Sequence, residues 1–121
     1  MNQAKIGGQE FAELLLAELP QLRDELQECR GLKHLEMMEF ALFTERACKR
    51  RDWKTVEKCL RLAEKLLRLK DSEVNNAVHV SFLEILPRKG KVHDRLKMIM
   101  TTDLRKAWDE ILAYLSKVSR T

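Results

Sequence analysis

Helix-breaking residues are scarce in this chain, whose 121 residues include only four glycines and two prolines. A sheet protein with frequent tight turns needs more of both, so their scarcity favours long helices. Apolar positions are dominated by Leu, and 35% of the residues are charged. Leu, Ala, Glu, Lys and Arg are also the strongest helix formers. The sequence therefore predicts an all-α fold, a compact multi-helix bundle that forms a single domain over residues 1–121.

Apolar residues recur at helical spacing in seven segments. The expected helices cover approximately residues 9–19, 20–30, 35–51, 52–69, 71–86, 92–100 and 102–117. Pro20 suits the first turn of the second helix, where its missing N–H costs nothing, and Gly31 offers a stop. Asp52 is a good N-cap for the clearest of the seven helices, and Asp71 or Ser72 can cap the next.

One segment carries a conflicting pattern, because Val78, Val80 and Phe82 alternate with polar residues as they would in a strand. No second convincing strand exists to pair with it, and an isolated strand leaves its backbone unsatisfied. We therefore expect a helix there. With the preceding helix it forms a hairpin at about residues 52–86, whose second helix looks like that of a HEAT-type repeat. No exact period recurs along the chain, so a regular solenoid is not predicted.

No catalytic or metal-binding pattern is present in the sequence. The three histidines lie at no ligand spacing from one another or from a cysteine, and there is no glycine-rich phosphate loop. We therefore expect no enzyme activity, no metal and no cofactor. Cys29, Cys48 and Cys59 fall within helical apolar patterns and are expected to be reduced, buried thiols. No segment resembles a secretory signal or a membrane span, so a cytoplasmic protein without membrane contact is expected.

Charge is unevenly distributed, with a net charge of −3 over residues 1–31 and +5 over residues 32–70. Five basic residues repeat at alternating spacings of four and three, which places them on one helix face. This basic stripe consists of Lys54, Lys58, Arg61, Lys65 and Arg68. It is interpreted as a solvated face, as a site for an acidic protein partner, or as a nucleic-acid surface. The last is the weakest, because Glu57 and Glu64 can pair with stripe residues and no aromatic residue interleaves with them.

Two tryptophans and four of the methionines also lie in helical apolar patterns. Trp53 and Trp108 are expected to be core anchors, although an exposed tryptophan would instead mark an interface. The methionines at positions 37, 38, 98 and 100 are expected to fill gaps, although exposed methionines suit an adaptable binding surface.

The stretch from Asp71 to Glu84, Asp-Ser-Glu-Val-Asn-Asn-Ala-Val-His-Val-Ser-Phe-Leu-Glu, resembles a family of small all-helical bacterial proteins. In that family an acidic-x-Glu-Val-x-Asn stretch leads into Val-Ser-Phe-Leu-Glu. The helix before it and the distal Leu104-x-x-x-Trp108 helix fit the same layout. Members are found as immunity proteins encoded beside polymorphic toxins, such as those delivered by contact-dependent or type VI systems.

The resemblance implies that this chain binds a cognate toxin domain and neutralises it by stoichiometric occlusion. Asn75, Asn76 and His79 are the contact residues that it suggests, although these side chains can equally support the helix start or lie in solvent. The basic stripe is a second candidate surface, and the net charge of +4 favours an acidic-surfaced toxin. The alternatives are a helical adaptor or scaffold protein and, less favoured, a basic nucleic-acid-binding module.

Overall fold

The computed structural model describes residues 8–69 and 71–118, and most of them lie in helices. The elements in chain order are α1 (Gly8–Glu18), the short 3-10 turn η1 (Pro20–Leu22), α2 (Arg23–Gln27), α3 (Lys33–Lys49), α4 (Trp53–Arg68), α5 (Ser72–Ala77), the π-helix η2 (Val78–Leu83), α6 (Gly90–Ile99) and α7 (Thr102–Val118). No strand occurs among these residues. The prediction of an all-α fold is confirmed.

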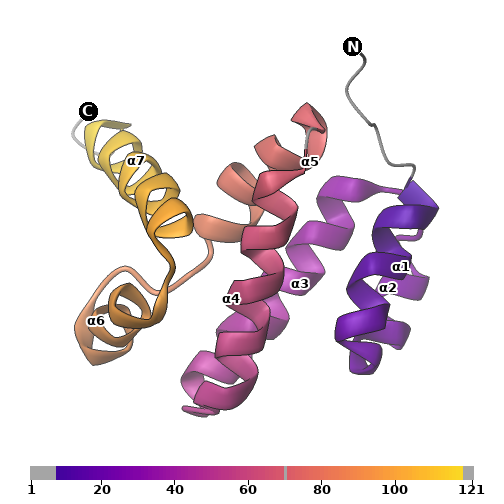
Figure 1. Cartoon of the computed structure of the whole chain (residues 1–121), viewed down its shortest axis with the longest axis horizontal. Coiled ribbons are helices and arrows are strands. Elements are labelled where there is room, and N and C mark those ends of the chain that lie inside the picture. Colours follow the sequence, from indigo (N-terminus) through magenta and orange to yellow (C-terminus); the bar gives the residue numbers. More distant parts are fainter. Residues whose placement is uncertain (1–7, 70, 119–121) are drawn as a thin grey trace.

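Helix α3 lies at the centre of the bundle and contacts α1, α2, α4, α5 and η2. Figure 1 shows α4 in front of α3, with α1 and α2 on one side and the α6–α7 pair on the other. Helix α7 reaches the rest of the bundle through contacts with α4 and η2. Helix α4 thus has α1 along one flank and α7 along the other, which leaves its outer face open to solvent.

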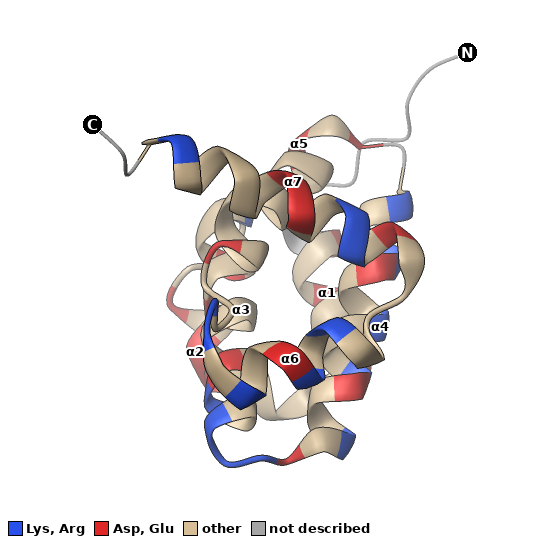
Figure 2. Ribbon diagram, turned by 90° about the vertical axis from the view of Figure 1, so that its left-hand side faces the viewer, with Lys and Arg blue, Asp and Glu red and all other residues tan. Residues whose placement is uncertain are grey.

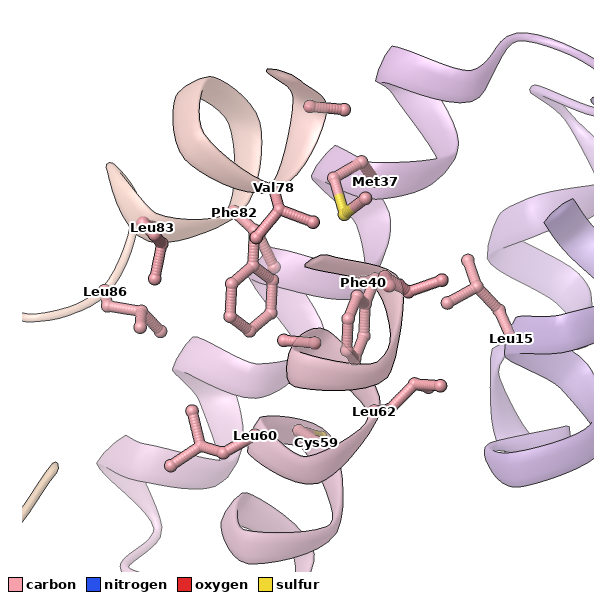
Figure 3. Close-up of a cluster of buried hydrophobic side chains, with 14 of the residues drawn as sticks. Leu15, Met37, Phe40, Cys59, Leu60, Leu62, Val78, Phe82, Leu83 and Leu86 are labelled. Atoms are coloured by element: carbon pink, nitrogen blue, oxygen red, sulfur yellow. The ribbon is translucent and has the colours of Figure 1, made fainter. Parts of the chain in front are cut away.

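The core is a continuous cluster of apolar side chains from all these helices. Phe40 of α3 and Phe82 of η2 stack at its centre with ring centroids 4.7 Å apart. Figure 3 shows Leu15 of α1 approaching this pair from one side and Leu60 of α4 lying below it. Offset aromatic pairs of this kind add to the stabilisation that burial alone provides. This contact therefore ties the π-helix to the central helix.

The helix expected over residues 20–30 is divided in two. Pro20 begins the turn η1, in which the N–H of Arg23 donates to the carbonyl of Pro20, and α2 then runs only to Gln27. Such tight turns are common at helix starts. The predicted apolar positions Leu22, Leu26 and Cys29 are nevertheless buried. Gly31 has a φ of +89°, a conformation that glycine adopts readily, and ends the segment as expected.

The helix expected over residues 71–86 changes type halfway, from α5 to the π-helix η2. Its i→i+5 hydrogen bonds widen the turn. As a result Val78, Phe82 and Leu83 all face the core, whereas Val80 is exposed. The alternating pattern therefore belongs to a widened helix, and the rejection of a strand was correct. The segment packs against both α3 and α4, and its likeness to a HEAT repeat stays a prediction.

The two tryptophans differ from each other. Trp108 is fully buried, as predicted, and its ring lies 4.7 Å from the ring of His93 on α6. Trp53 is only half-buried, but it packs against the core cluster at its edge. Among the methionines, Met37 and Met100 are buried, whereas Met38 and Met98 are exposed.

Candidate protein-binding surfaces

A polar hollow of about 320 Å³ lies where α4 ends and α5 begins. It is lined by Leu69, Asp71, Ser72, Asn75, Asn76 and His79. The three contact residues suggested by the sequence are therefore brought together at one place. Helical spacing explains this, because positions 75, 76 and 79 lie within one turn of the helical segment.

The start of α5 is held in place by a buried carboxylate. Asp71 accepts hydrogen bonds from the backbone N–H groups of Glu73 and Val74, and it caps the helix as predicted. The Lys33 ammonium of α3 lies 3.7 Å from Asp71 and 3.0 Å from Glu73. The Lys33–Asp71 pair is shielded from bulk water, since only 9% of the Lys33 side chain and none of the Asp71 side chain is exposed, whereas Glu73 is half-exposed. Asp71, which lines the hollow, is therefore held in place by these bonds.

Asn75 and His79, which line the hollow, make hydrogen bonds within the protein. The Asn75 side-chain amide donates to the Leu67 carbonyl at 2.8 Å, which joins α5 to the end of α4. His79 Nδ1 lies 3.0 Å from the Asn75 carbonyl. A carbonyl can only accept, so Nδ1 is the donor in this hydrogen bond. Asn76 is exposed. Asn76 and His79 Nε2 are therefore better placed than Asn75 to contact a partner.

The five residues of the basic stripe, Lys54, Lys58, Arg61, Lys65 and Arg68, are all exposed on α4. Among the described residues, Arg68 is the one stripe residue in an ion pair, at 2.9 Å from Glu64 and 3.2 Å from Asp103 of α7. The expected pair between Glu57 and Arg61 is absent among the ion pairs of the described residues. Consequently the stripe is less neutralised by its own helix than the sequence suggested.

A further basic surface, missed by the sequence analysis, surrounds Trp53. A hollow of about 270 Å³ is lined by Arg51, Trp53, Lys91, Asp94, Arg95 and Met98, and we call these residues the Trp53 surface. The Arg95 guanidinium lies over the Trp53 ring, 5.2 Å from its centroid, in a cation–π contact. Met98 is 80% exposed. Folding thus places an aromatic ring beside basic residues that lie outside the basic stripe.

The turn between α3 and α4 adds charge to this end of the molecule. Lys49, Arg50 and Arg51 are exposed there, and they form the blue turn at the bottom of Figure 2. Arg51 has a φ of +59°, the left-handed conformation that glycine usually supplies at a helix end. An arginine in this conformation is strained by about 1 kcal/mol. A cation thus occupies position 51, where glycine would adopt the backbone conformation with less strain.

The three cysteines are buried and free, as expected. Burial raises the pKa of the Cys48 thiol from its ordinary value of 9.0 to about 11, and that of Cys59 likewise to about 11. Burial also raises the pKa of Cys29. Buried thiols with raised pKa values are poor nucleophiles, so their role is in packing. Within residues 8–69 and 71–118, no three His, Cys, Asp or Glu side chains gather closely enough to hold a metal ion.

Comparisons with known proteins place the chain in a family. The model of a family described as a domain of unknown function (DUF7674) matches residues 12–116, and the chain belongs to this family. No curated protein and no solved structure matches the chain. None of the described helices is both long and apolar enough to cross a membrane.

Proposed function

We propose that this member of the DUF7674 family is an immunity protein that binds a bacterial toxin domain and neutralises it by stoichiometric occlusion. The resemblance of residues 71–84 to immunity proteins motivates the role, and the Trp53 surface supports binding to an acidic protein. No covalent step or turnover is required of the chain. The protein acts in the cytoplasm, where such a toxin would meet its target.

The Trp53 surface is the observation that carries this proposal. Tryptophan, arginine and methionine are enriched in protein interfaces, and tryptophan and arginine dominate binding hot spots. Here an exposed methionine and a half-buried tryptophan lie among cations from both α6 and the α3–α4 turn. Such cations steer an acidic partner toward the surface and raise the association rate. Trp53 and Met98 then supply apolar surface area that becomes buried when the partner binds.

The polar hollow offers a second contact region on the same protein. Asn76 lies on the capped helix α5, and the His79 ring is held by the contact of its Nδ1 atom with the Asn75 carbonyl. Groups fixed in this way lose little conformational entropy on binding, and this favours affinity. Occlusion needs no further chemistry, since a rigid helical body over the toxin's active site excludes its substrate.

The proposal is tested by co-expressing the chain with the toxin domain encoded beside its gene. Co-elution as a 1:1 complex and protection of the cells from the toxin are the expected results. Arg51→Gly removes a cation while suiting the left-handed turn, and Lys91→Glu reverses a second charge. Together they should weaken binding by about tenfold or more and reduce its salt dependence. Lys106→Glu, an exposed charge reversal on α7, is the matched control.

Each alternative predicts a different outcome. A helical adaptor binds a cellular regulator, and no toxin is neutralised. A nucleic-acid module binds DNA or RNA with an affinity that falls steeply with salt. Undiminished toxin killing in the presence of the folded chain contradicts the immunity role.

A further inference from the structure

An apolar groove of about 270 Å³ runs between α1 and α4, on the flank of α4 opposite α7. It is lined by Leu14, Ala17, Glu18, Leu62, Lys65, Leu66 and Leu69. Leu14 is 41% exposed although it lies in the middle of a helix. A second, shallower hollow on α1 shares Leu14 and Ala17 with the groove, so both sides of Leu14 are open. The groove and Leu14 together form an apolar seam that none of the described helices covers.

The two borders of this seam carry opposite charges. On the α1 side, Glu13 is exposed and Glu18 lines the groove. On the α4 side, Lys58 and Lys65 are exposed, and Lys65 also lines the groove. Folding thus sets the acidic first part of the sequence beside the basic second part on one face. Helices α1 and α4 contact each other, and Figure 1 shows α3 behind the space between their ribbons.

A face of this kind is complementary to itself. A two-fold axis that runs along the seam, between α1 and α4, reverses left and right when a second copy is laid on the first. It therefore places the acidic α1 border of each copy over the basic α4 border of the other. The two Leu14 side chains meet the two grooves at the centre. Self-complementarity under a two-fold axis is what a symmetric dimer interface requires.

We propose that the α1–α4 face is the interface of a homodimer, with α1 of each copy seated against α4 of its partner. The interface has an apolar centre and charged borders, the usual anatomy of a specific contact. The Trp53 surface lies on the other side of α4 and stays open in this arrangement. The inference therefore does not depend on the proposed function, and a dimer would present two such surfaces.

The first experiment measures the mass of the purified full chain by sedimentation equilibrium over a range of concentrations. We expect a reversible monomer–dimer equilibrium that shifts toward monomer at high salt, because salt screens the border charges. Ala17→Arg places a bulky cation in the seam, and it should raise the dimer dissociation constant by at least about tenfold. Ala113→Arg, at an exposed alanine of α7, is the matched control and should change nothing.

The second experiment uses charge exchange. Glu13→Lys with Glu18→Lys makes both borders basic, and Lys58→Glu with Lys65→Glu makes both acidic. Each double variant should be monomeric alone, because like charges then face each other, whereas a 1:1 mixture should form a heterodimer. Circular dichroism checks that both are folded. A wild-type chain that stays monomeric at all concentrations, or a mixture that does not associate, overturns the proposal.

Discussion

The Phe40 and Phe82 rings stack 4.7 Å apart and join the central helix α3 to the π-helix η2. Both side chains are fully buried. Phe82→Ala removes the stacking and leaves a cavity, so it should lower the free energy of unfolding by about 3–5 kcal/mol. Urea denaturation measures this loss. Val80→Ala, at an exposed position of the same π-helix, should cost less than about 1 kcal/mol; an equal loss for both variants would contradict the central role of the pair.

Asn75 and Asn76 provide a matched comparison on neighbouring positions. Asn75 donates to the Leu67 carbonyl, whereas Asn76 is exposed. Asn75→Ala should therefore lower the free energy of unfolding by about 1–2 kcal/mol, since it leaves a half-buried carbonyl unsatisfied. Asn76→Ala should change it by less than about 0.5 kcal/mol. Thermal and urea unfolding of the two variants test this, and the reverse order would show that the amide bond to Leu67 does not hold α5 in place.

Two of the three buried cysteines, Cys48 and Cys59, predict a loss of stability at alkaline pH. Because burial raises the pKa of Cys48 and of Cys59 from 9.0 to about 11, the folded state holds their protons more tightly than the unfolded state. The resulting stability is complete below pH 9 and is lost as the pH rises toward about 11. The free energy of unfolding, measured by urea titration at each pH, should therefore fall across this range. A Cys48→Ala variant should show a shallower fall.

The same burial predicts slow thiol chemistry. At pH 8 a thiol reagent such as DTNB should react with none of the three cysteines in the native protein within the mixing time, and with all three in guanidinium chloride. Rapid reaction of Cys48 or Cys59 in the native state would mean that the α3–α4 packing opens readily.

The buried carboxyl of Glu36 predicts that the free energy of unfolding changes with pH in acidic solution. It is fully buried, and its Oε2 atom accepts a hydrogen bond from the Gly31 N–H at 3.0 Å. Desolvation raises the pKa of this carboxyl, although the Gly31 bond opposes the rise. The stability due to its proton is present at and below pH 4.5 and is lost as the pH rises through the folded-state pKa. Glu36→Gln cannot ionise, so its free energy of unfolding relative to wild type should increase over that range. A constant difference would contradict the raised pKa.

The sequence by itself determined the helical fold and most of the core. Scarce glycine and proline and the spacing of Leu22, Leu26, Leu60 and Leu66 are local signals, because helix formation depends on neighbours three and four residues away. The same locality identified Asp52 and Asp71 as caps, since each accepts a hydrogen bond from a backbone N–H group two or three residues after it. The clustering of Asn75, Asn76 and His79 likewise follows from helical spacing alone.

Only the tertiary structure decided what the surface looks like. The pattern along its own helix predicts that Trp53 is a core residue. In the folded chain it is also part of a basic surface, because Arg95, some forty residues later in the sequence, lies over its ring. The widened turn of η2, which brings Val78, Phe82 and Leu83 to one face, depends on their packing into the core with α3. The α1–α4 groove requires two segments about fifty residues apart to lie together. Contacts between distant segments leave no spacing pattern in the chain, and for that reason the candidate interfaces were the part that the sequence could not specify.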